Sequence, residues 1–233
     1  MSGSIVSPEL RARIRGVATP VALGFGRLGL TPNHLTLIGF GIAVIAAVAA
    51  AEQAWVLAGV LLIVGGVFDL FDGALARATG TTSRLGAFMD SVFDRAGEGV
   101  VYVGIAAGCV GGGFVEGALL AAAAMAASFM VSYVRAKSES LGFTAGTGMA
   151  AIGLAPREVR IVILTVGLLL VGLTGGIVDH AAACALKGGC DADDGSAVTT
   201  NFGLALSLGL ITILATITAI QRIVHVTRQI PQE

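Results

Sequence analysis

The 233-residue sequence has little charge. Its 14 Lys and Arg and 15 Asp and Glu residues make up 12% of the chain, against roughly 25% in an ordinary soluble domain. Hydrophobic residues make up 55%, and the mean hydropathy is +0.90. These values exclude a water-soluble globule and indicate an integral membrane protein. The net charge of −1 supplies no general basic field, so nucleic acid is excluded as a partner.

The first residues also lack the uninterrupted apolar core of a cleaved signal peptide, so we expect the first spanning segment to direct insertion. The chain instead has long apolar stretches bounded by polar, glycine or proline residues. At roughly 20 residues per span, they predict an all-α polytopic membrane protein with six transmembrane helices. The expected spans are Asn33–Ala51, Ala54–Leu75, Gly86–Cys109, Phe114–Arg135, Val159–Val178 and Phe202–His225.

An amphipathic segment precedes the first span. Leu10, Ile14, Val17 and Val21 recur at helical spacing, with arginines between them. This pattern predicts an interfacial helix on the membrane surface, with a solvated basic tail as the alternative. The expected division is residues 1–32 as the interfacial helix, 33–228 as the six-helix catalytic domain and 229–233 as a C-terminal tail.

The basic residues indicate the orientation. Six spans place twelve of them on one side, which the positive-inside rule assigns to the cytoplasm together with both termini and the active site. Those twelve are Arg11, Arg13, Arg15, Arg27, Arg77, Arg84, Arg135, Lys137, Arg157, Arg160, Arg222 and Arg228. The other side receives Lys187 and several acidic residues. We therefore expect a multi-pass protein of the cell (inner) membrane.

Cysteines and glycines leave two questions open. Cys184 and Cys190 lie in a loop on the predicted outer side, where a disulfide is permitted, and two free thiols are the alternative. Gly104 and Gly108 form a small-xxx-small pair that favours close helix approach, or that arises by chance among 34 glycines.

Four aspartates interrupt the second and third expected spans. Each costs about 2.5–3.5 kcal/mol at a helix centre in lipid, so their charge must be compensated. Asp69 and Asp72 are three residues apart and Asp90 and Asp94 four apart, so each pair occupies one helix face. Antiparallel helices bring the pairs to one depth. All-oxygen ligation without a nearby Cys or His predicts one or two hard divalent cations, namely Mg²⁺, Mn²⁺ or Ca²⁺.

The residues around the aspartates favour a diphosphate ligand. Gly73, Ala76, Gly80 and Gly86 remove side-chain bulk, and Arg77 supplies a fork of donors suited to phosphate. Hard metals beside such a surface indicate phosphoryl transfer or diphosphate cleavage.

These residues carry a family resemblance. Asp69-x-x-Asp72-Gly73-x-x-Ala76-Arg77, followed by Gly86-x-x-x-Asp90-x-x-x-Asp94, resembles the complete signature of the CDP-alcohol phosphotransferases (CDP-alcohol phosphatidyltransferases), membrane enzymes of phospholipid synthesis. The resemblance implies that an acceptor hydroxyl attacks the β-phosphorus of a CDP-linked lipid, such as CDP-diacylglycerol or CDP-archaeol, and that CMP leaves. It also implies a homodimer.

The resemblance implies a role for each signature position. Asp69, Asp72 and Asp90 would hold the metal, and Asp94 would be the catalytic base and also touch metal. The nucleotide and diphosphate pocket would be lined by Asp69, Gly73, Ala76, Arg77 and Gly86.

Basic residues outside the signature indicate an anionic acceptor, although positive-inside loops alone are the alternative. The segments Ser132-Tyr133-x-Arg135-Ala136-Lys137 and Arg157-x-x-Arg160, with Gln221-Arg222 near the end of the last expected span, resemble the prokaryotic branch that makes phosphatidylinositol phosphate or archaetidylinositol phosphate from inositol phosphate. That resemblance assigns the acceptor phosphate to Ser132, Arg135, Lys137, Arg157, Arg160 and Arg222.

Other interpretations stay open. Pro156-Arg157-Glu158-Val159-Arg160 departs from the Glu-Arg-x-Glu-Arg pattern of that branch, so glycerol 3-phosphate, giving phosphatidylglycerol phosphate, is the alternative acceptor. The aspartates also fit a small cation transporter, or a buried ion-pair network with Arg77, Arg84 and Arg95.

Overall fold

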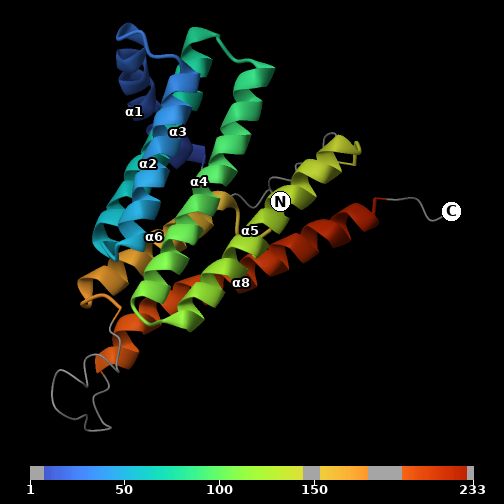
Figure 1. The fold of residues 1–233 in the computed structure, drawn as a ribbon. Helices are drawn as coiled ribbons and strands as arrows, with labels where there is room; N and C mark the ends of the chain where they lie inside the picture. The colour runs from blue at the N-terminus through green and yellow to red at the C-terminus, as the bar shows by residue number, and fades with distance from the viewer. Residues whose placement is uncertain (1–7, 144–152, 178–195, 230–233) are drawn as a thin grey trace, which may run out of the picture.

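The computed structural model of the protein describes residues 8–143, 153–177 and 196–229, and within them it contains seven α-helices and no strand. The all-α prediction is confirmed, and each expected span coincides with one helix. The helices are α1 (Pro8–Arg27), α2 (Pro32–Ala51), α3 (Trp55–Thr79), α4 (Arg84–Gly111), α5 (Val115–Ser140), α6 (Arg157–Leu173) and α8 (Ser196–Thr227) (Figure 1).

Four of these helices, α2, α3, α5 and α8, are long and apolar enough to cross a membrane. Helix α6 has 17 residues and is about 25 Å long, short of a hydrocarbon core of about 30 Å. Every 18-residue stretch of α4 includes the charged Asp94, Arg95 and Glu98. Both helices that fall short also contribute charged residues to the site, Asp90 and Asp94 from α4 and Arg157 from α6.

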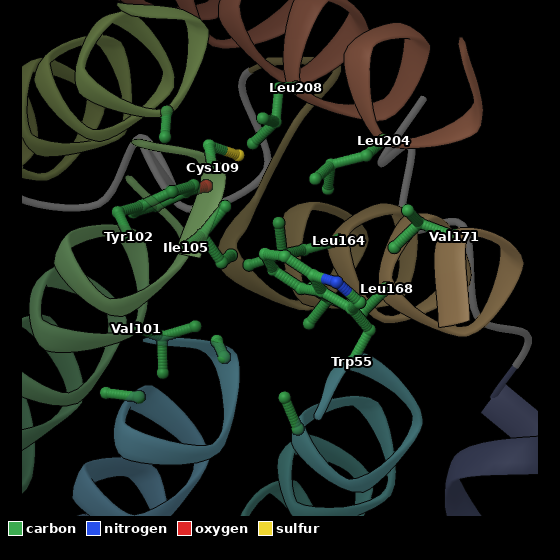
Figure 2. Packing of buried hydrophobic residues seen from close by; sticks show 14 of the residues in the cluster. Trp55, Val101, Tyr102, Ile105, Cys109, Leu164, Leu168, Val171, Leu204 and Leu208 are labelled. Atoms are coloured by element: carbon green, nitrogen blue, oxygen red, sulfur yellow. The ribbon is translucent and has the colours of Figure 1, made fainter. Parts of the chain in front are cut away.

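The helices are arranged around α2 and α8. Helix α2 packs against both α3 and α4, α1 lies on α3, and α8 packs along α5 and α6 (Figure 1). Their shared core contains Trp55, Tyr102, Leu168 and Leu208, each at most 2% exposed (Figure 2). Cys109 is buried in the same core as a free thiol. The loop with Cys184 and Cys190 lies outside the described residues.

Glycine allows α2 and α4 to approach closely. A methyl group added at Gly104 would overlap the Ala47 carbonyl, and one at Gly108 would overlap the Ala50 carbonyl. The Gly104 and Gly108 pair therefore has the packing role that its spacing favours. This approach holds α4, with its aspartates, against α2.

Local caps define the helix ends near the aspartates. Thr31 begins α2, and its Oγ1 accepts a hydrogen bond from His34 N at 3.3 Å. Gly80 ends α3 in the left-handed conformation, with φ of 67°, which glycine adopts at little cost. Ser83 begins α4, and its Oγ accepts from Gly86 N at 2.9 Å. The turn between the two aspartate helices is thus specified by residues inside the signature region.

Candidate active site

The four aspartates lie on two helices that both pack against α2. Asp72 is 6% exposed, and Thr36 of α2 donates a hydrogen bond from Oγ1 to Asp72 Oδ2 at 2.8 Å. Asp69 lies against Gly39 of α2, where an added Cβ would be 3.0 Å from Asp69 Oδ1. Helix α2 therefore orients one carboxylate and leaves room for the other.

The four carboxylates share one electrostatic neighbourhood. The negative charge of Asp69 acts on the other three, and that of Asp90 acts on two of them. Like charges at such range repel strongly in a medium of low dielectric constant. A cation among them is needed to offset this repulsion.

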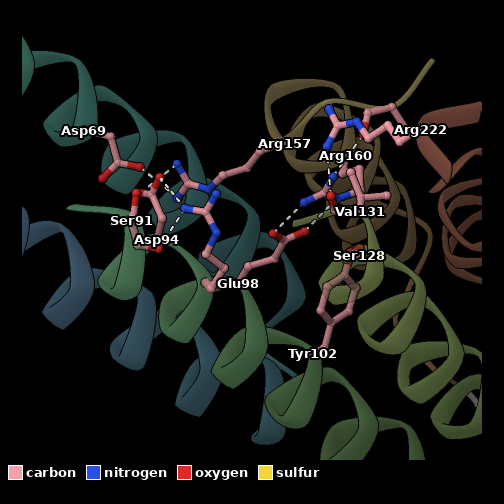
Figure 3. Close-up of polar contacts among 12 residues, drawn as sticks. Asp69, Ser91, Asp94, Glu98, Tyr102, Ser128, Val131, Arg157, Arg160 and Arg222 are labelled. Atoms are coloured by element: carbon pink, nitrogen blue, oxygen red, sulfur yellow. Dashed lines mark hydrogen bonds and ion pairs between the residues drawn. The ribbon is translucent and has the colours of Figure 1, made fainter. Parts of the chain in front are cut away.

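Arg157, the first residue of α6, supplies that cation in the structure. Its Nη2 lies 2.9 Å from Asp69 Oδ2, and its Nη1 lies 2.9 Å from Asp94 Oδ1. Figure 3 shows the guanidinium between the two carboxylates. Arg157 Nε is buried with no hydrogen-bond partner, so the side chain is not fully satisfied in this position. Arg95 is a more distant neighbour of Asp94, at 3.8 Å.

The four carboxylates fit a divalent metal in their chemistry, although they are not gathered around one point. Among the described residues, no three His, Cys, Asp or Glu side chains are gathered closely enough to hold an ion as they stand. The ligand chemistry nevertheless fits, because the carboxylates supply only oxygen, as Mg²⁺ and Mn²⁺ prefer. The guanidinium of Arg157 also shows that the space between Asp69 and Asp94 accepts a positive charge.

A cavity of about 410 Å³ adjoins the other two aspartates. Asp72 and Asp90 line it, as do four residues of the predicted nucleotide pocket: Gly73, Ala76, Arg77 and Gly86. The rim adds the polar side chains of Thr31, Asn33, Thr81, Thr82 and Ser83. Asp69, which the resemblance also assigned to the nucleotide, is not among the lining residues.

Glycine shapes this cavity. The Arg77 guanidinium folds back over Gly73, where an added Cβ would lie 3.1 Å from Arg77 Nη1. At Gly86, an added Cβ would lie 3.4 Å from Asn33 Oδ1. These positions keep the wall between Arg77 and Asn33 free of side-chain bulk, so that a flat ligand can reach the backbone.

Basic residues from α5 and α8 gather beyond Arg157. The positive charges of Arg135 and Arg160 act on Arg222, which is 4% exposed and donates from Nη1 to the Val131 carbonyl at 2.8 Å. Arg135 also pairs with Glu139 at 2.8 Å. Ser132 is half-buried on α5, and Lys137 is exposed near the end of that helix.

Arg160 is buried, as Arg222 is, and its guanidinium is paired with a buried carboxylate. It is 1% exposed, and it donates to both carboxylate oxygens of Glu98, at 2.9 and 2.8 Å. Its Nη1 donates to the Ala155 carbonyl at 2.9 Å (Figure 3). Arg160 therefore does not line the open part of the site as the helices stand.

Sequence reasoning missed two residues that hold these groups, Thr36 and Glu98. A signal for Glu98 was present, because it continues the four-residue spacing of Asp90 and Asp94 on one face of α4. Thr36 has no comparable pattern, since a threonine in an apolar helix is common.

A bundle of long apolar helices with a carboxylate-lined cavity and a cluster of arginines defines a membrane protein of the enzyme class that handles phosphorylated ligands. Residues 29–189, more than half of the chain, match the CDP-alcohol phosphatidyltransferase family. The chain belongs to that family and is a CDP-alcohol phosphotransferase.

Two named relatives are similar to two thirds of the chain or more. The chain is 39% identical over 156 residues to archaetidylinositol phosphate synthase of Pyrococcus horikoshii, covering 67% of this chain and 78% of that one. It is 32% identical over 223 residues to phosphatidylinositol phosphate synthase of Cutibacterium acnes, covering 94% and 97%.

Solved structures share the fold. The crystal structure of Mycobacterium tuberculosis phosphatidylinositol phosphate synthase with CDP-DAG bound superposes with a TM-score of 0.72 at 23% identity, covering 93% of this chain and 98% of that one. The same enzyme in complex with manganese and citrate gives a TM-score of 0.72 at 24% identity, covering 93% of each chain.

Proposed function

We propose that the protein transfers the phosphatidyl or archaetidyl group of a CDP-linked lipid to a hydroxyl of inositol phosphate and releases CMP. The proposal rests on one observation: two of the four carboxylates line the cavity, and the other two contact Arg157. Asp72 and Asp90 line the cavity, and Asp69 and Asp94 contact Arg157. A donor diphosphate and an anionic acceptor would therefore meet at one carboxylate cluster.

The donor binds in the cavity. Arg77 holds the diphosphate by charge-assisted hydrogen bonds, while Gly73, Ala76 and Gly86 let the nucleotide approach the backbone. Asp69 reaches the same ligand from the edge of the cluster. The names of the Pyrococcus and Cutibacterium relatives and the bound CDP-DAG of the Mycobacterium enzyme support this donor class.

The acceptor phosphate binds to the basic cluster. Converging cations such as Arg135 and Arg222 repel one another, and an anion placed between them relieves this repulsion. Arg157 joins them from α6, with Ser132 and Lys137 nearby. The names of the two relatives favour inositol phosphate over glycerol 3-phosphate.

Asp94 acts as the general base. It takes the proton of the acceptor hydroxyl as the oxygen attacks the β-phosphorus, a new P–O bond forms, and the bond to the CMP oxygen breaks. Arg157 contacts Asp94 at 2.9 Å, so one residue connects the base with the acceptor phosphate. Positioning and charge neutralisation supply most of the catalysis.

Asp69, Asp72, Asp90 and Asp94 hold one or two Mg²⁺ or Mn²⁺ ions. Bound there, the metal would neutralise charge on the diphosphate and on the leaving CMP oxygen. Arg157 would then give up its contacts with Asp69 and Asp94 and remain beside the cluster, where its guanidinium would be available to the acceptor phosphate. Thr36 fixes Asp72 Oδ2 by its hydrogen bond, which would leave the other carboxylate oxygen to bind the ion.

The six-span topology completes the proposal. Helices α4 and α6 cross the membrane together with the four more apolar helices, and α1 (Pro8–Arg27) lies at the interface as the helix of the N-terminal division. The catalytic domain covers residues 33–228, with both termini and the site facing the cytoplasm. The family resemblance supports a homodimer.

An acceptor panel tests the proposed function. Purified protein is given CDP-diacylglycerol, Mn²⁺ and each of inositol phosphate, glycerol 3-phosphate and unphosphorylated inositol, and CMP release is measured. We expect release with inositol phosphate. Release with glycerol 3-phosphate alone would reassign the acceptor, and equal rates with unphosphorylated inositol would refute the phosphate site.

A variant separates the two ligand sites. Arg222→Gln removes a charged donor, a contribution of about 1.5–3 kcal/mol, so we expect the acceptor KM to rise by roughly one order of magnitude or more while the CDP-lipid KM stays unchanged. Loss of CDP-lipid binding instead would contradict the assignment of Arg222.

A further inference from the structure

The buried ion pair between Glu98 and Arg160 takes no part in the chemistry proposed above. The two side chains are 3% and 1% exposed, and their closest atoms are 2.8 Å apart. Burying two charges costs more than apolar packing of the same volume in many proteins, so such a pair is weak grounds for a purely stabilising role. The position of the pair on α4 and α6 indicates a further role.

The pair runs beside the contact between Asp94 and Arg157. Glu98 follows Asp94 by four residues on α4, and Arg160 follows Arg157 by three on α6, so both pairs join the same faces of the same two helices (Figure 3). Helix α6 packs mainly on α3 and α8. The two arginine pairs are polar contacts that join the first turn of α6 to α4.

The same pair is connected to α8. Arg160 holds the Ala155 carbonyl, and the backbone N–H groups of Leu154 and Ala155 donate to Thr218 Oγ1, each at 3.0 Å. Thr218 lies one turn before Arg222. A continuous path of hydrogen bonds thus leads from Glu98 to the helix that carries Arg222.

We propose that Glu98 and Arg160 are positioning residues, which hold the first turn of α6 so that Arg157 stays beside the carboxylate cluster and in register with Arg222. Arg160 thereby acts on the acceptor phosphate through Arg157, without touching it. The inference rests on the proposed function, because it concerns the site that receives the acceptor.

The test removes both charges at once. Glu98→Leu combined with Arg160→Met leaves no unpaired charge, and replacements of this kind often preserve stability. We expect the thermal transition to stay close to that of the wild type, the acceptor KM to rise about tenfold or more through misplacement of Arg157, and the CDP-lipid KM to change less than about twofold. An unchanged acceptor KM, or equal changes in both KM values, would overturn the proposal.

A matched control removes another buried contact of α4. Tyr102 Oη and Ser128 Oγ are 3.4 Å apart one turn beyond Glu98, and Tyr102→Phe combined with Ser128→Ala deletes both hydroxyls. We expect both KM values of this variant to match the wild type. An acceptor KM raised as much as in the Glu98 and Arg160 variant would refute a specific positioning role.

A double-mutant cycle tests whether the pair acts through Arg157. In an Arg157→Lys background, which loses the two-pronged contact, removing the Glu98 and Arg160 pair should raise the acceptor KM less than about twofold further. Fully additive effects would overturn the route through Arg157.

Glu98→Asp, which keeps the charge, is a second and milder variant. We expect it to raise the acceptor KM about threefold and to leave the CDP-lipid KM unchanged. If the wild-type protein releases no CMP with any phosphorylated alcohol, the proposed function itself is refuted. If the wild type is active and the variants have unchanged KM values, only the positioning role is refuted.

Discussion

Arg157→Gln should increase the affinity of the protein for Mn²⁺ in the absence of substrates. In the structure, the guanidinium makes contacts of 2.9 Å with both Asp69 and Asp94, so an ion that uses these carboxylates must first displace it. A fully buried charged hydrogen bond contributes about 1.5–3 kcal/mol. The Arg157 side chain is 27% exposed, which reduces each contact to about 0.5–1 kcal/mol. The sum of about 1–2 kcal/mol corresponds to a Kd lower by roughly 5- to 30-fold.

The assay is a titration of detergent-solubilised protein with Mn²⁺, in which the free ion is measured by electron paramagnetic resonance. Arg95→Gln is the matched control, because it removes the same charge beside Asp94 but only a contact of 3.8 Å. We expect a change of less than about threefold for that control. Unchanged or weaker Mn²⁺ binding by Arg157→Gln would refute the competition between Arg157 and the ion. An equal gain in Mn²⁺ affinity in both variants would show only general repulsion between the arginine charges and the ion.

Two further predictions concern α2. Thr36→Val removes the hydrogen bond to Asp72 and should weaken Mn²⁺ binding by about tenfold in the same titration. Thr36→Ser keeps the hydroxyl and should bind Mn²⁺ as the wild type does. Wild-type Mn²⁺ affinity in Thr36→Val would contradict the orienting role of Thr36. Gly104→Ala forces a methyl group into the Ala47 carbonyl and should destabilise the protein by about 1–3 kcal/mol, measured as a lower temperature of thermal aggregation. Gly41→Ala is the control, because a methyl group there meets nothing within 4 Å. Equal shifts of the aggregation temperature in both variants would contradict the close approach of α2 and α4 at Gly104.

Much of the fold was predictable because apolar length and polar punctuation are local properties. Every expected span has its helix, and the ends at Thr31 and Ser83 use ordinary capping chemistry. Membrane crossing was less certain from sequence. Helix α6 is short and α4 has charges along its first half, and both features reflect the site that these helices build.

The aspartates of the site were predictable from the sequence, whereas the positions of the arginines around them were not. The spacing of Asp69, Asp72, Asp90 and Asp94 already placed each pair on one face of its helix, because side-chain direction follows helical periodicity. The bridge by Arg157 and the burial of Arg160 were not predictable, since both depend on how α6 lies relative to helices far away in sequence. Two arginines three residues apart on one helix thus have different surroundings.

Asp94→Asn tests the central claim most directly. Radiolabelled CMP release from CDP-diacylglycerol is measured with inositol phosphate and Mn²⁺, and the variant is first shown to bind the CDP-lipid and to keep the wild-type thermal transition. The account predicts metal-dependent CMP release by the wild type and its loss by a factor of about 10² or more in the variant, which lacks the base. CMP release by the variant at the wild-type rate would contradict the role of Asp94. Cation flux into vesicles without CMP release by the wild type would contradict the account as a whole.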